Sequence, residues 1–186
     1  MHEATRVLRN EHDAILRMLD VAEETAGQLE AGKKVPGEIL TGLLEFLRLF
    51  ADQCHHGKEE DLLFPLMEKK GMPRDGGPIG VMLHEHEQGR ALIRAMNEAA
   101  AAYNLGEKAA GMNWAKPALA YVALLREHIF KENNILFMMA ERMLSPEEQA
   151  QLAEEFERVE KEKMGAGTHE RLHALMDQLS AAATVR

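Results

Sequence analysis

Aromatic residues are scarce in this chain, and cysteine is nearly absent. Aromatics make up 5% of the 186 residues, and Cys54 is the only cysteine. A lone cysteine cannot form an intramolecular disulfide, which excludes a disulfide-stapled secreted scaffold. No apolar run approaches the roughly 20 residues that a membrane helix needs, and the opening MHEATRVLRNEHDAIL lacks the basic and apolar regions of a signal peptide. We therefore expect a cytoplasmic protein with no membrane partner.

Positive charge is also in short supply. The chain has 31 acidic and 22 basic residues, so its formal net charge is −9. This excess of negative charge opposes binding to phosphate backbones, and we expect no nucleic-acid partner. Apolar residues at 46% and charged residues at 28% are typical of a globular protein. The chain is rich in methionine, with twelve residues, and in histidine, with nine, so the histidines become the first candidates for chemistry.

Hydrophobic periodicity predicts helices throughout the chain. Apolar residues recur at helical spacing, and no segment shows the period-two alternation of a strand. The expected long helices cover about residues 3–30, 36–70, 79–104 and 115–143. Pro65 interrupts the second of these, and Ser145 with Pro146 opens a fifth helix, which a short sixth follows. We expect an all-α protein: an up-down four-helix bundle of residues 1–145 with a C-terminal helical extension, residues 146–186, packed on it.

The chain contains an internal repeat. Residues 54–65 read CHHGKEEDLLFP and residues 127–138 read EHIFKENNILFM, which places HxxKE and a Leu-Phe pair at an offset of 73 residues. A second pair of motifs, EHD at residues 11–13 and EHE at residues 85–87, is offset by 74. The two halves of the bundle, each a helix pair, are therefore predicted to be copies related by a pseudo-two-fold axis. Each half contributes one EH histidine and one HxxxE pair.

The repeated motifs predict a cluster in the core. Residues four apart on a helix share a face, so HxxxE directs an imidazole and a carboxylate to one place. Four inward-facing helices would bring together six residues: His12, His55, Glu59, His86, His128 and Glu132. Two buried carboxylates at one level of a core repel each other, and a pair of cations removes that cost. Imidazole and carboxylate donors suit iron, manganese or zinc, with two histidines on each ion and both carboxylates bridging.

Several neighbouring residues allow alternative interpretations. His56 and Glu60 also fit HxxxE, and only the repeat alignment favours the preceding pair, so these two are alternative ligands or supporting residues. Tyr121 lies two turns before the last HxxxE pair, where it lines the pocket, donates a hydrogen bond to a metal-bound ligand or belongs to the core. His169 and His173, near the C-terminus, either cap the bundle, contribute to a second site or lie on a solvated helix face.

These motifs resemble the hemerythrin-like family, the HHE cation-binding domain. CHHGKEEDLLFP and EHIFKENNILF are similar to its second and fourth helix signatures and GGPIGVMLHEHEQGR to its third, so the likeness covers about residues 4–143. It is especially close to the di-iron domain of bacterial iron–sulfur-centre repair proteins, which carry a site of four histidines and two glutamates. The resemblance implies two iron ions, with manganese or zinc as substitutes, held by the six residues above, with Glu59 and Glu132 as the bridging carboxylates.

The resemblance implies that the protein binds or reduces a small oxidant, namely dioxygen, nitric oxide or peroxide, as a sensor or stress-response protein. The alternatives are iron storage or donation for metal-centre repair, and simple oxygen binding. Oxygen-carrying hemerythrins have HxxxH on the third helix, whereas here Met82 and Arg90 flank His86 at that spacing. The sequence shows no flavin, haem or nucleotide motif, so any electron donor would be external. It leaves open whether the centre turns over, which ligand it takes and whether the chain is oligomeric.

Overall fold

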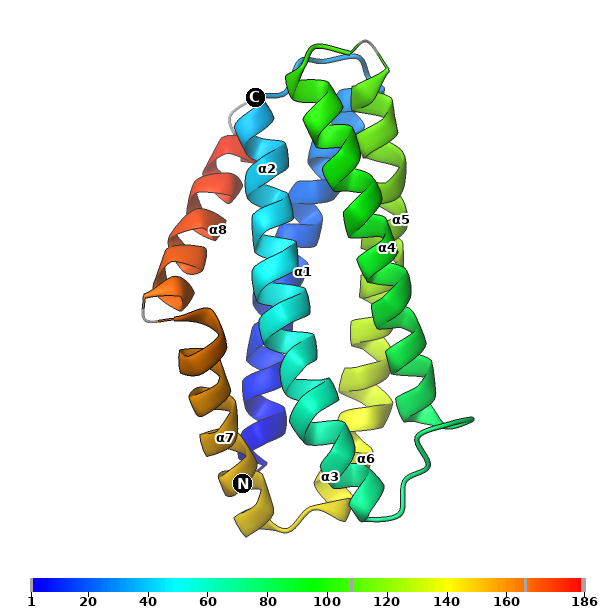
Figure 1. The fold of residues 1–186 in the computed structure, drawn as a ribbon, viewed down its shortest axis with the longest axis vertical. Coiled ribbons are helices and arrows are strands. Elements are labelled where there is room, and N and C mark those ends of the chain that lie inside the picture. The colour runs from blue at the N-terminus through cyan, green and yellow to red at the C-terminus, as the bar shows by residue number, and fades with distance from the viewer. Residues whose placement is uncertain (1, 108, 166, 185–186) are drawn as a thin grey trace.

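The computed structural model describes residues 2–107, 109–165 and 167–184, and over these residues it contains helices and no strand. The helices of residues 3–143 line up into four long rods, which run alternately up and down, and the last helices of the chain lie along one side (Figure 1). The first rod is α1, Glu3–Glu30, and the third is α4, Pro78–Asn104. The predicted all-α bundle with additional C-terminal helices is confirmed. None of the helices formed by the described residues is long and apolar enough to cross a membrane.

The second and fourth rods each combine α-helix with π-helix. The second consists of α2, Gly37–Phe46; η1, Leu47–His56; η2, Glu59–Leu63; and α3, Phe64–Lys69. The fourth consists of α5, Ala110–Lys131; η3, Glu132–Leu136; and α6, Phe137–Met143. The η segments are π-helical, with hydrogen bonds between residues i and i+5, so each turn holds more residues than an α-helical turn. Glu59 and Glu132 occupy equivalent places, because each begins a π-helical segment.

The rods accommodate two prolines in different ways. Pro65 lies in the first turn of α3, where its missing N–H costs little, and the rod continues past it. Pro117 lies inside α5, which begins at Ala110 rather than near residue 115 as the sequence predicts. The earlier start is explained by Trp114, whose side chain is fully buried, because burial of its large apolar surface favours extension of the helix.

The fifth helix begins with a capping box. In α7, Pro146–Met164, the Ser145 hydroxyl accepts a hydrogen bond from the backbone N–H of Glu148. The Glu148 carboxylate in turn accepts one from the backbone N–H of Ser145. Two N–H groups that the helix cannot pair are thereby satisfied, and the predicted N-cap is confirmed.

The last two helices cover one side of the bundle. Figure 1 shows α7 beside the N-terminal end of α1 and α8, Thr168–Thr184, beside α2. Phe156 of α7 is buried in an apolar cluster with Leu8 and Phe64, and Leu172 of α8 is buried in a second cluster with Phe50. The domain boundary predicted after residue 145 stays a prediction.

A polar layer separates these two apolar clusters. On α1, His12 lies between Leu8, which belongs to one cluster, and Ile15, which belongs to the other. The ring of Phe137 stacks on the His12 ring, with centroids 5.4 Å apart and planes 9° apart. Burying each such apolar side chain contributes about 1.5–3 kcal/mol, so the two clusters hold the rods together on either side of the layer. The polar side chains between them are therefore kept away from bulk water.

Candidate metal centre

The six residues predicted from the repeat meet in the polar layer. None of them is more than 1% exposed: His12, His55, Glu59, His86, His128 and Glu132. They come from all four rods of the bundle, as the repeat requires. They form two sets of four that share both glutamates, and within each set one nitrogen or oxygen per residue lies within 4.8 Å of the others. Each set could hold a metal ion.

We call these sets the His12 half, which contains His12 and His55, and the His86 half, which contains His86 and His128. In the His12 half, Nε2 of His12 lies 3.1 Å from Oε2 of Glu132. Nε2 of His55 lies 3.7 Å from Oε1 of Glu59 in the same half.

The other oxygen of each carboxylate faces the His86 half. Nε2 of His86 lies 3.5 Å from Oε2 of Glu59, and Nε2 of His128 lies 3.2 Å from Oε1 of Glu132. Each glutamate therefore directs one oxygen to each half. This is the arrangement that a carboxylate needs in order to bridge two cations.

Most of the inward-facing atoms lack a hydrogen bond among the described residues. They include Nε2 of His12 and of His55 and both carboxylate oxygens of Glu59 and of Glu132. Buried polar atoms in proteins are nearly always paired, so a cluster of unpaired donors and acceptors needs an explanation. Nε2 of His86 and Nε2 of His128 lie 3.1 Å apart, and two nitrogens bound at right angles to one ion, each about 2.1 Å from it, would be about 3 Å apart. The residues present therefore fit a pair of metal ions.

The outer nitrogen of His55 is held by a carboxylate and a lysine. Nδ1 of His55 lies 2.8 Å from Oε2 of Glu11, and the Lys58 ammonium donates to both Glu11 and Glu160 of α7. A carboxylate behind Nδ1 keeps the proton on that nitrogen and leaves the Nε2 lone pair directed inward. Burial alone would raise the pKa of Glu11, but His55 and Lys58 outweigh it and lower the pKa, so the carboxylate stays charged.

The pseudo-two-fold axis repeats this arrangement at His128. Nδ1 of His128 lies 2.9 Å from Oε2 of Glu85, and Lys131 donates to the same carboxylate. The glutamate of each EH motif thus supports the HxxxE histidine of another rod, and the lysine of each HxxKE motif supports that glutamate. The repeat aligns Glu11 with Glu85 and Lys58 with Lys131, so these four residues could have been recognised as a repeated part of each half from the sequence, although residue type and spacing alone do not reveal what they contact.

The two EH histidines are also supported from behind. Nδ1 of His12 lies 2.9 Å from Oδ1 of Asn133, and Nδ1 of His86 lies 2.6 Å from Oε1 of Glu60. Asn133 and Glu60 each directly follow one of the central glutamates, so this relationship also obeys the repeat. Arg90 donates to Glu60 and thereby holds its carboxylate in place. All four histidines consequently present Nε2 to the cluster.

The two central carboxylates have opposite electrostatic surroundings. Burial, together with the neighbouring Glu132 carboxylate, raises the pKa of Glu59 well above its usual range. Burial would raise the pKa of Glu132 as well, but His128 and His12 more than compensate and hold it well below its usual range. Without a cation the two carboxyls therefore differ in how readily they ionise. Metal ions between them would allow both to ionise.

The structure separates His56 from Glu60, the alternative HxxxE pair. His56 is 2% exposed and its ring stacks on that of His86, with centroids 3.8 Å apart. Glu60 lies behind His86, outside the group of inward-facing atoms. Tyr121 belongs to the apolar cluster that contains Phe50, and its hydroxyl has no hydrogen bond among the described residues.

Two histidines outside the cluster, His84 and His173, have ordinary surroundings. His84 is exposed and pairs with Gln88 on the same helix. The His173 ring lies edge-on to that of Phe50, with centroids 5.9 Å apart, so α8 uses it to pack on η1. The side chain of His169 lies outside the described residues.

A further group of possible metal ligands is already paired with a lysine side chain. Glu11, Cys54 and Glu160 come close enough to bind a metal ion, but the Lys58 ammonium pairs with both carboxylates. Burial raises the pKa of the Cys54 thiol to about 12, which disfavours the thiolate that a metal would need. We assign no metal to this group.

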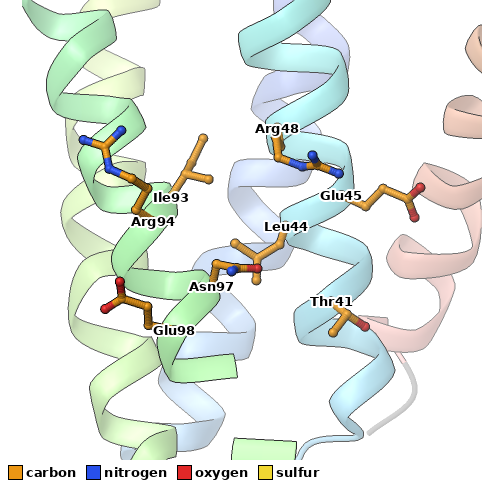
Figure 2. Close-up of a pocket in the computed structure, with 8 residues that line it drawn as sticks. All are labelled: Thr41, Leu44, Glu45, Arg48, Ile93, Arg94, Asn97 and Glu98. Carbon is orange, nitrogen blue, oxygen red and sulfur yellow. The ribbon is translucent and has the colours of Figure 1, made fainter. Parts of the chain in front are cut away.

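A cavity of about 400 Å³ opens between the second rod and α4 (Figure 2). Its lining combines two arginines and two glutamates with uncharged polar and apolar residues: Thr41, Leu44, Glu45, Arg48, Ile93, Arg94, Asn97 and Glu98. None of these residues belongs to the buried cluster. The cavity therefore lies apart from the candidate metal centre.

Fold and site together define a class of protein: an all-α bundle whose core encloses a histidine–glutamate cluster suited to metal cations. The family model described as hemerythrin HHE cation binding domain matches residues 3–140. The chain belongs to this family. The resemblance drawn from the sequence motifs is confirmed.

Several relatives share much of the chain. The iron-sulfur cluster repair protein DnrN of Neisseria gonorrhoeae is 36% identical over 134 residues, which cover 69% of this chain and 81% of DnrN. The iron-sulfur cluster repair protein YtfE of Edwardsiella ictaluri is 31% identical over 143 residues, which cover 73% of this chain and 62% of YtfE. An uncharacterized protein of Mycobacterium tuberculosis is 28% identical over 161 residues, which cover 85% of this chain and 61% of that protein. The chain thus spans less than two thirds of the mycobacterial relative.

Proposed function

We propose that the buried cluster holds two iron ions, one in the His12 half and one in the His86 half. Glu59 and Glu132 would bridge the ions, and each ion would take two histidines. The observation that carries this proposal is that each carboxylate directs one oxygen to each half. Manganese and zinc accept the same donors and are possible substitutes.

We infer that the centre binds or reduces a small oxidant, either dioxygen, nitric oxide or peroxide, in a sensor or stress-response role. Bound iron would supply a change of oxidation state and positions open to a ligand. The chain's own contribution is to fix the imidazoles through their Nδ1 partners and to exclude bulk water from the layer. Apolar clusters on both sides favour entry of a small uncharged molecule over a large or charged one. A free, buried thiol suits a reducing compartment, and we propose the cytoplasm.

A second candidate is iron storage or donation for the repair of metal centres. Two relatives named iron-sulfur cluster repair proteins support this candidate. It predicts that the bound iron is labile and passes to an acceptor protein. The first candidate predicts that iron stays bound while an oxidant is consumed or held.

One experiment separates these possibilities. The metal-free chain is loaded with ferrous iron without oxygen, and absorption spectra and reductant consumption are recorded with dioxygen, nitric oxide and peroxide in turn. Catalytic consumption of one oxidant supports an enzyme, and a stable reversible adduct supports binding or sensing. Loss of iron to an added apoprotein supports donation. A chain that takes up fewer than two ions would contradict the two-iron centre.

A further inference from the structure

We propose that His56 is a further metal ligand, which gives the His86 half a third imidazole. The inference rests on the proposed two-metal centre and adds a ligand that the internal repeat does not contain. His56, His86 and His128 each place one nitrogen so that the three atoms lie within 4.8 Å of one another. All three side chains are buried. They form a three-histidine set on one side of the bridging carboxylates.

The position of His56 follows from the π-helix. His55 and His56 are adjacent, and in an α-helix adjacent side chains diverge by about 100°. Both are the last residues of η1, whose wider π-helical turn reduces the angle between neighbouring side chains. The His55 and His56 rings consequently lie 5.7 Å apart, centroid to centroid, and both face the layer. His56 stacks on His86 and meets His128 edge-on, with ring centroids 5.6 Å apart.

Neither nitrogen of His56 has a hydrogen bond among the described residues, although the side chain is only 3% exposed. Nδ1 lies 3.5 Å from Oδ1 of Asp52. Asp52 is in turn held by Arg90, whose Nε donates to it across 2.8 Å. This is the pattern found behind the other histidines, in which a carboxylate or amide oxygen faces Nδ1. A metal ion would give Nε2, the nitrogen that Asp52 does not face, a partner.

The two halves of the centre differ in this respect. At the repeat offset of 73 residues, His56 corresponds to Ile129 and Asp52 corresponds to Leu125, and both of these apolar residues are buried. The His12 half therefore has two imidazoles and two carboxylate oxygens, whereas the His86 half has three imidazoles and two carboxylate oxygens. An ion in the His12 half would have more positions free of protein donors. External ligands are expected to bind at that ion first.

The test is a titration of the metal-free full chain with Co²⁺ without oxygen, followed through the visible absorption bands of the ion, which report its donor set. The wild type is expected to bind two ions. His56→Ala should keep one ion with unchanged bands and bind the other at least about 10-fold more weakly with shifted bands. His84→Ala, which alters an exposed histidine, serves as the matched control and should match the wild type.

His56→Gln supplies a second variant that keeps most of the side-chain volume, and circular dichroism of each metal-free variant verifies the fold. His56→Gln should weaken binding of the same Co²⁺ ion that His56→Ala weakens. Two ions bound with wild-type affinities and bands in both His56 variants would overturn the proposal for His56 while leaving the two-metal centre in place. A wild-type chain that binds fewer than two ions would instead overturn the proposed function.

Discussion

Nδ1 of His55 lies 2.8 Å from Oε2 of Glu11, a residue 44 positions earlier on a different rod. The contact ties the orientation of a candidate ligand to a carboxylate that does not reach the centre. Removing such a partner typically lowers metal affinity by 10–100-fold. We expect Glu11→Gln to weaken iron binding by about that factor, measured by competition with a chelator. Glu154→Gln, which changes an exposed glutamate of α7, should bind iron like the wild type.

Removing one inward-facing histidine should abolish part of the metal binding. We expect His55→Ala to retain one iron ion or none, measured by elemental analysis after anaerobic loading. A ligand present at 100 times its dissociation constant stabilises a protein by about 2.7 kcal/mol, so the loaded variant should also melt several degrees below the loaded wild type. Equal iron content in His55→Ala and in the control His84→Ala would refute the assignment.

Lys58 and Lys131 are equivalent in the repeat but differ in burial. The Lys58 side chain is 1% exposed and the Lys131 side chain is 32% exposed. Losing one partner of a buried ion pair costs about 3–5 kcal/mol, whereas exposed pairs contribute about 0–1 kcal/mol. Lys58→Met should therefore destabilise the chain far more than Lys131→Met, as measured by urea unfolding. Equal losses in the two variants would contradict the account given for the Glu11 carboxylate.

Metal binding should release protons. Burial lowers the pKa of His128, but Glu132 and Glu85 outweigh it and raise the pKa to about 9, so the metal-free ring is protonated at neutral pH. Burial and the neighbouring Glu132 carboxylate raise the pKa of Glu59, so its carboxyl keeps its proton to a higher pH than usual. Both protons must leave before these atoms can bind a cation, so the apparent affinity should increase with pH up to about 9. Calorimetry in buffers of different ionisation enthalpy counts the released protons, and an affinity independent of pH would refute this prediction.

Two phenylalanines test the role of the C-terminal helices. Phe156 of α7 is 1% exposed and Phe130 of α5 is 60% exposed. Truncating a buried phenylalanine costs about 3–5 kcal/mol, so Phe156→Ala should lower the free energy of unfolding by about that amount. Phe130→Ala should change it little. If Phe156→Ala is neutral, α7 does not contribute to the core as described.

Much of the fold and of the centre follows from the sequence. Helical periodicity predicts the rods, and the repeat predicts the six residues that meet in the polar layer. His55 and His56 show what helical spacing cannot predict. Neighbours on an α-helix diverge by about 100°, so the spacing places only one of the two histidines toward the layer, and nothing in the residue types marks η1 as π-helical. Contacts such as Lys58 with Glu160 join distant segments, so helical spacing could not predict them.

The π-helical turns constrain how the length of this chain can vary. η1 and η2 lie between the end of α2 and the Leu63-Phe64 pair that packs in the core. A change of one residue within an α-helical part of this rod, such as α2, would rotate every later side chain by about 100° relative to the bundle, because an α-helix has 3.6 residues per turn. Phe64 would then leave the core and Glu59 would turn away from the centre. A π-helical turn holds more residues than an α-helical turn, so it can absorb such a change. Insertions and deletions in related chains should therefore fall in the loops, such as residues 70–77, or in these wide turns.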